Sequence, residues 1–365
     1  MSSTVVRLKK DVSILTSVLS NPEVCFKLDE KHWGILLRQA RSANVLGRTL
    51  QAVDRCLPEI HWPPKLSQAY CAEKNLAAHR KNCLRWELET ISSLHLAMAI
   101  RPVLLKGAAY LASGFEFAKY RIFGDIDILV PHADLAKIEK CLMIDGWVTT
   151  KKDLYDQNYY RRWMHELPPM CHIHRGTTLD VHHGIVPRTA RYKPKPELLV
   201  ENVRPVLDMP TVDVFSVEDM YLHAAVHLFT DGDGLNAFRN LLDLHDLLII
   251  CFQGKNFSLD NLVDRSINLD LVIPLVFSGR YLERIFSLEV AAALNRRLIE
   301  REMMPRAMSF WDVIFDPIFL GFATFDPLRK LFAQEMLLIR GHFLRMPMTM
   351  LLPHLLRKAI RSKDK

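Results

Sequence analysis

The 365-residue chain lacks the features that mark several protein classes. No uninterrupted apolar run approaches the roughly 18 residues that a membrane-spanning helix needs. The seven cysteines are scattered and odd in number and form no C-x-x-C pair, which predicts reduced thiols rather than a disulfide framework. The apolar stretch 12–19 is too short for a signal peptide and has no small-x-small cleavage pattern. We therefore expect a cytoplasmic protein, with peripheral membrane contact left open.

The chain also lacks a basic body. The formal charge is +7, but residues 327–365 carry nine Lys/Arg and two acidic residues, so the first 326 residues are net neutral. A neutral body predicts no DNA partner and argues against RNA, because nucleic-acid binding usually needs a basic surface beside the site. Much of this excess positive charge lies in the segment 349–365, where leucines are interspersed with Arg and Lys. This segment is either a surface helix against the body or a contact for a membrane or an acidic partner.

Hydrophobic periodicity divides the chain into three regions. Residues 1–99 and 201–365 are dominated by apolar positions three and four apart, which predicts helices over 72–98, 217–229, 235–252 and 271–286. Between them, residues 100–200 alternate strand and helix patterns, with strands expected at 103–105, 126–130, 147–150 and 177–182. The sequence thus predicts an α+β fold, a small mixed-sheet core flanked by N- and C-terminal helical regions.

Gly124-Asp125-Ile126-Asp127 is the most informative motif. On a strand, residues two apart project from the same face, so Asp125 and Asp127 present two carboxylates side by side. Two such carboxylates repel unless a cation lies between them, and hard oxygens at this spacing suit Mg²⁺. A structural or solvated pair is the alternative interpretation.

Three further features favour a phosphate-handling site. Lys106-Gly107 lies between a strand and a helix, where a Gly allows phosphate to approach the backbone. Arg121 offers a fixed charge for a triphosphate. Asp180, in an alternating segment, can supply a third carboxylate to position and deprotonate a hydroxyl.

In this order, the motifs resemble the DNA polymerase β-type nucleotidyltransferase superfamily, and more narrowly the bacterial family called uncharacterised nucleotidyltransferases. The resemblance rests on residues 103–130, on Asp180-Val181-His182, and on Arg239 with Asp243 four residues later. It implies transfer of a nucleoside monophosphate from an NTP such as ATP to an unidentified hydroxyl-bearing acceptor, a small molecule, a glycan precursor or a protein, with release of pyrophosphate. Asp125, Asp127 and Asp180 would hold two Mg²⁺ ions, and Lys106, Gly107 and Arg121 would contact phosphates. His182, Arg239 and Asp243 would support the site.

Two other functions stay open. An abortive-infection-type toxin nucleotidyltransferase acting on RNA would share the Lys-Gly and Asp-x-Asp motifs. A non-catalytic scaffold would keep the fold and bind a membrane or partner through its basic tail. A zinc site is a weaker hypothesis, because the nearby ligand types follow no standard zinc spacing: Cys171, His172, His174, His182 and His183.

Overall fold

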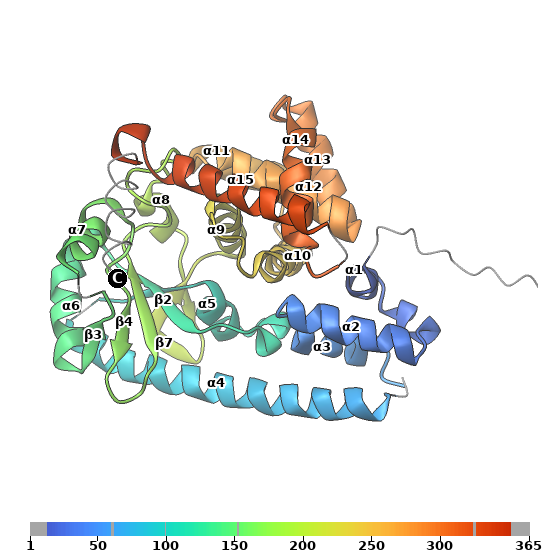
Figure 1. The fold of residues 1–365 in the computed structure, drawn as a ribbon. Coiled ribbons are helices and arrows are strands. Elements are labelled where there is room, and N and C mark those ends of the chain that lie inside the picture. The colour runs from blue at the N-terminus through green and yellow to red at the C-terminus, as the bar shows by residue number, and fades with distance from the viewer. Residues whose placement is uncertain (1–12, 60–61, 99, 152, 324–325, 352–365) are drawn as a thin grey trace, which may run out of the picture.

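The computed structural model describes residues 13–59, 62–98, 100–151, 153–323 and 326–351 (Figure 1). They form helices around one mixed sheet of seven strands, which confirms the α+β prediction. No helix in this part of the chain is both long and apolar enough to cross a bilayer. Most of the basic amphipathic segment, 352–365, lies outside the described residues, so its contacts stay a prediction.

The strands are short and the helices numerous. The strands are β1 Val103–Leu105, β2 Asp125–Leu129, β3 Trp147–Thr149, β4 Met170–His172, β5 Thr178–His182, β6 Arg204–Val206 and β7 Met209–Val214. The helices are α1 Ile14–Ser20, α2 Glu30–Ser42, α3 Leu46–Cys56, α4 Pro64–Met98, α5 Lys106–Ala112, α6 Leu135–Ile144, α7 Leu154–Trp163, α8 Pro196–Val200, α9 Val217–Thr230, α10 Ala237–Gln253, α11 Leu259–Asn268, α12 Val272–Phe286, α13 Glu289–Glu300, α14 Met308–Phe319 and α15 Pro327–Arg345. Three 3₁₀ turns are η1 Pro22–Lys27, η2 Glu116–Tyr120 and η3 His132–Asp134.

The sheet order is β3-β4-β5-β2-β1-β7-β6, which places β2 at its centre. β2 runs antiparallel to β1 and parallel to β5. In this register Asp127 lies directly opposite Asp180. The strand pairing therefore brings together the two acidic motifs that are more than 50 residues apart in the sequence.

The predicted helices and four predicted strands are confirmed, but three strands were not anticipated. β4 and β6 have only three residues each, too few to show a period of two. β7 pairs with β1, so the sheet extends to Val214, beyond the 100–200 range expected for the core. The division into three domains stays a prediction.

The sheet lies between two helical layers. α4 runs beneath it, whereas α9, α10 and α12 to α15 lie above it (Figure 1). Alternation along β2 buries Ile126 and Ile128 on the face opposite the aspartates, with 0–3% of each side chain exposed. One continuous apolar core connects the N-terminal helices, the sheet and the C-terminal helices.

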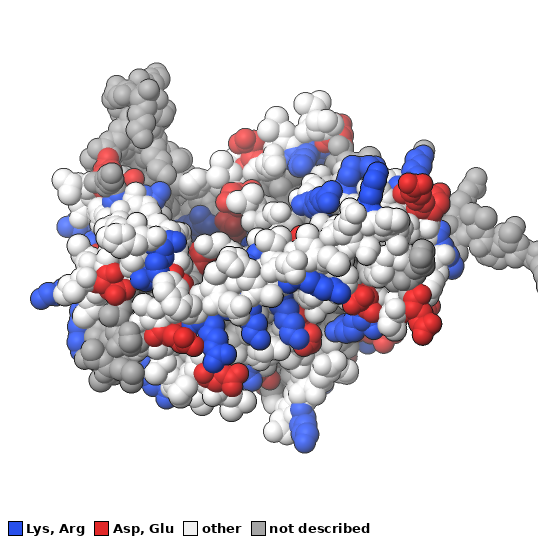
Figure 2. Space-filling view, turned by 90° about the horizontal axis from the view of Figure 1, so that it is seen from below, with Lys and Arg blue, Asp and Glu red and all other residues white. Residues whose placement is uncertain are grey.

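The outer side of α4 is charged with both signs. Lys81, Arg85 and Glu89 are exposed there, and Arg85 pairs with Glu89 at 3.1 Å. Figure 2, the view onto this layer, shows Lys and Arg interspersed with Asp and Glu. A surface of mixed sign gives a polyanion such as RNA little net attraction on this face.

A buried ion network joins the helical regions to the sheet. Asp243 on α10 accepts hydrogen bonds from Arg48 on α3 at 2.5 Å and from Arg121, just before β2, at 2.7 Å. Arg48 also donates to Asp246 at 2.7 Å. Asp243 and the two arginines that it binds are only 2–5% exposed. Removing one member would leave buried charge without its partner.

We expect Asp243→Ala to lower the free energy of unfolding by about 3–5 kcal/mol, because Arg48 and Arg121 would both lose their shared buried carboxylate. Urea denaturation followed by circular dichroism measures this loss. The matched control is Glu89→Ala, which removes an exposed ion pair and should cost less than about 1 kcal/mol. Equal losses in the two variants would contradict the structural role of the network.

Candidate active site

The turn between β1 and α5 places a lysine over the sheet. Lys106 adopts φ +47°, a left-handed conformation unusual for a side chain other than glycine. Its Nζ donates to Oδ1 of Asp127 at 2.8 Å. Gly107 follows, where a Cβ atom would lie 2.5 Å from Nη1 of Arg121 and 3.0 Å from the Phe123 side chain. The glycine is therefore required for the close packing of the turn against the segment before β2.

The carboxylate of Asp127 is the most constrained group of the site. Only 3% of the residue is exposed, and the Oδ1 atom that accepts from Lys106 also lies 3.0 Å from Nε2 of His182. Burial alone would raise the pKa of Asp127, but Lys106 and His182 outweigh it and hold that pKa well below its usual range. Asp127 is therefore ionised at neutral pH. The hydrogen bond to Asp127 and the charge of Glu166 outweigh the desolvation of His182 and raise the pKa of its imidazole.

Asp125 and Asp180 have the opposite electrostatics. Burial, and then the charge of Asp127, raise the pKa of both carboxyl groups, for Asp180 to about 7. Oδ1 of Asp180 is buried and has no hydrogen-bond partner among the described residues. A carboxyl group that titrates near neutral pH, next to an ionised one, suits a proton acceptor or a metal ligand.

A cavity of about 380 Å³ opens in front of Asp125 and Asp127. Its wall brings together most of the residues predicted from sequence: Lys106, Gly107, Arg121, Asp125, Asp127, Arg239 and Asp243. Asp180 does not line this cavity and reaches the site through its pairing with Asp127. The volume lies in the range typical of small-ligand pockets.

The two arginines of this wall differ in their partners. Arg121 is buried and binds Asp243, so it contributes to the internal network as well as to the cavity. Arg239 donates to the carbonyl oxygen of Ile122 at 2.8 Å and to Asn240, not to Asp243. Burial, and then the nearby Arg121 guanidinium, lower the pKa of Arg239 to about 10. An anion in the cavity would relieve the repulsion between these two guanidinium groups. Arg239 therefore contributes more directly to the cavity wall than its position in the sequence indicated.

Glu166 and His165 were not anticipated from the sequence. They precede β4 and meet β5 through a bridge between Glu166 and His182, whose Nδ1 atom lies 3.4 Å from Oε2 of Glu166. The donor atoms of Asp127, Asp180 and His182 lie within 4.8 Å of one another, as do those of His165, Glu166 and His182. No spacing pattern in the sequence indicates His165 and Glu166, because a loop brings them to the sheet.

The zinc ligands considered from sequence do not come together. In the described residues, only His182 of that set belongs to a group of three potential ligands. Nε2 of His172 lies 2.8 Å from the carbonyl oxygen of Asp145, and the His183 ring packs edge-on against His132 at 4.8 Å. Strand alternation points His182 and His183 to opposite faces, which separates them.

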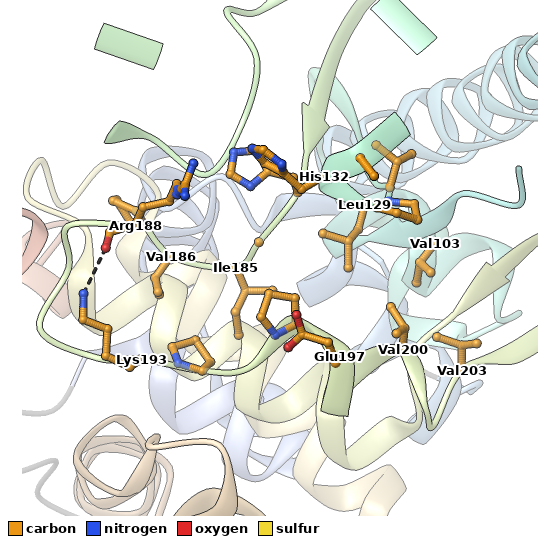
Figure 3. Close-up of a pocket in the computed structure, with 18 of the residues that line it drawn as sticks. Val103, Leu129, His132, Ile185, Val186, Arg188, Lys193, Glu197, Val200 and Val203 are labelled. Atoms are coloured by element: carbon orange, nitrogen blue, oxygen red, sulfur yellow. Dashed lines mark hydrogen bonds between the residues drawn. The ribbon is translucent and has the colours of Figure 1, made fainter. Parts of the chain in front are cut away.

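A second and larger cavity, of about 830 Å³, lies at the other end of β2. Figure 3 shows Arg188 and Lys193 at one end of it, and Val103, Val200 and Val203 at the other. Leu129 lines this cavity, and it lies two residues beyond Asp127, about 7 Å along the same face of the strand. The two cavities therefore lie at opposite ends of β2 and share no lining residue.

The raised pKa of Asp180 makes the stability of the metal-free protein depend on pH. Between about pH 4 and 7 the folded state holds a proton that the unfolded state has lost, so stability falls as the pH rises through this window. We expect Asp180→Asn to become progressively more stable than the wild type across this window, with a plateau above pH 7. Urea denaturation in EDTA at pH 4, 5, 6, 7 and 8 measures the difference. A constant difference would contradict the raised pKa.

Comparison with known proteins gives one result. A search of curated proteins found no match. The family model described as "Uncharacterised nucleotidyltransferase" matches residues 29–287, a range that includes all seven strands and the helices α2 to α12. The match confirms the family resemblance that the Asp-x-Asp motif indicated. It also extends well beyond residues 103–130, which contain that motif. The chain belongs to the family of uncharacterised nucleotidyltransferases, and is therefore a transferase with a nucleotide substrate.

Proposed function

We propose that the protein catalyses Mg²⁺-dependent transfer of a nucleoside monophosphate from an NTP to a hydroxyl group, with release of pyrophosphate. The observation that supports this most is the register of β2 and β5, which sets Asp180 opposite Asp127. Two carboxylates in the wall of the cavity, with a third on the neighbouring strand, fit in-line nucleotidyl transfer.

The donor set fits Mg²⁺, because it consists of hard carboxylate oxygens and includes the unpartnered Oδ1 of Asp180. Asp125, Asp127 and Asp180 would hold the metal. When bound, Mg²⁺ would neutralise the phosphate charge and position the attacking and leaving oxygens.

The remaining residues have separate roles in this proposal. Lys106 neutralises Asp127 in the metal-free site and can turn to a phosphate oxygen. Arg239 and Arg121 present guanidinium groups to the triphosphate. Asp180, opposite Asp127 on the neighbouring strand, accepts the proton of the acceptor hydroxyl. His182 holds Asp127 in place through its Nε2 atom.

We expect Asp125→Asn and Asp127→Asn to weaken metal-dependent nucleotide binding by at least about 10-fold and to reduce transfer by about 10²–10³-fold, since each removes a metal ligand. Fluorescence titration with labelled NTPs, with and without Mg²⁺, measures binding without requiring the acceptor. Asp208→Asn, an exposed change in the β6–β7 turn, is the matched control and should have no effect. Nucleotide binding that keeps its full Mg²⁺ dependence in both variants would refute the proposed site.

For the acceptor, the 830 Å³ cavity at the other end of β2 is our candidate. Aliphatic side chains such as Val103 and Val200 line one end of it, and Arg188 and Lys193 lie at the other, which favours a small molecule with an apolar part.

We expect Val200→Trp, which narrows this cavity from a partly exposed position, to leave NTP binding unchanged but to reduce transfer to acceptors in a small-molecule extract by at least about 10-fold. Leu207→Trp adds the same bulk at a 98% exposed position and should change neither. Unchanged transfer in Val200→Trp would place the acceptor elsewhere.

A further inference from the structure

Two imidazoles and a carboxylate, those of His165, His182 and Glu166, lie close together beside β5. Oε2 of Glu166 lies 3.4 Å from Nδ1 of His182 and 4.0 Å from Nε2 of His165, and the two rings are 5.2 Å apart. The backbone fixes this arrangement. Leu167 donates to the carbonyl oxygen of Val181 at 2.8 Å, and the amide of His183 donates to the carbonyl oxygen of His165 at the same distance.

Hydrogen bonds within the described residues do not satisfy all the polar atoms of this cluster. Nδ1 of His182, the nitrogen that faces Glu166, is buried without a hydrogen-bond partner in the described part of the chain. His182 is only 2% exposed, and its 3.4 Å separation from Glu166 is longer than a good hydrogen bond. Unpaired buried polar atoms cost about 1–3 kcal/mol each, so a missing partner is the simplest explanation.

We propose that His165, Glu166 and His182 bind one Zn²⁺ ion, separate from the Mg²⁺ site. Two ligands bound at about 2.0–2.1 Å in a tetrahedral site lie about 3.3–3.4 Å apart, which matches the distance between His182 and Glu166. Two imidazoles with one carboxylate suit Zn²⁺ better than Mg²⁺, which prefers oxygen ligands. Three protein ligands leave the fourth position for water.

The other nitrogen of His182 supports this assignment. Zinc-bound histidines usually direct their second ring N–H to a carboxylate or carbonyl, and Nε2 of His182 lies 3.0 Å from Asp127. The ion would thus hold His182 as an N–H donor toward the catalytic aspartate. Zinc binding itself does not depend on the proposed transferase function, because it requires neither nucleotide nor Asp125.

The test uses the full-length protein, stripped of metal and titrated with Co²⁺ as a spectroscopic substitute for Zn²⁺. We expect about one equivalent of Co²⁺ with visible d–d bands of four-coordinate geometry, displaced by one equivalent of Zn²⁺. His165→Gln and Glu166→Gln should each weaken binding by at least 10-fold. His174→Gln, at an exposed histidine, and Asp125→Asn, in the Mg²⁺ site, should both keep the bands.

Failure of the wild type to bind Co²⁺ or Zn²⁺, or retention of the bands by both ligand variants, would overturn the proposal and leave a protonated His182 paired with Glu166. If the variants do not fold, X-ray absorption of the wild-type Zn²⁺ complex decides. Two imidazoles in a shell at about 2.0–2.1 Å support the site, whereas an all-oxygen shell refutes it.

Discussion

The buried carboxylate of Asp127 is the interaction on which the site depends. A nearly inaccessible negative charge is stable only with compensating partners, and here they are Lys106, at the start of α5, and His182, at the end of β5. Burial, and then the same charge, raise the pKa of Asp180 and Asp125, so a bound cation would stabilise the ionised form of both carboxyl groups. The left-handed turn at Lys106 follows from the same requirement, because it directs the ammonium group back over the sheet.

The helical regions contribute to the site as well as covering the sheet. Asp243 binds Arg121 at the entrance of β2 and Arg48 on α3, while Arg239, one turn earlier on α10, holds the carbonyl oxygen of Ile122. α10 is thereby fixed to the segment that leads into the Asp-x-Asp motif. The family match, which covers residues 29–287, includes α3 and α10 together with the sheet.

Much of this arrangement could be predicted from the sequence, for physical reasons that differ between its parts. Asp125 and Asp127 could be placed on one face of a strand because alternation on a strand is local. Gly107 was expected for the approach of a phosphate, and the structure adds that its lack of a side chain allows Arg121 and Phe123 to pack closely against it. Arg239 and Asp243 were expected to support the site, but the sequence did not indicate that Asp243 binds arginines from two distant segments. Glu166 and His165 could not be predicted, because a loop without periodicity brings them to β5 through long-range backbone pairing. The strands β4 and β6 were too short to carry a pattern.

The central claim is that this site transfers the nucleotidyl part of an NTP rather than its terminal phosphate. The most direct test supplies the protein with a small-molecule extract, Mg²⁺ and NTP labelled either at the α- or at the γ-phosphorus. The account predicts that the α-label appears on an acceptor while the γ-label leaves as pyrophosphate, and that both depend on Mg²⁺. Appearance of the γ-label on the acceptor, with the α-label left in the nucleoside diphosphate, would contradict it.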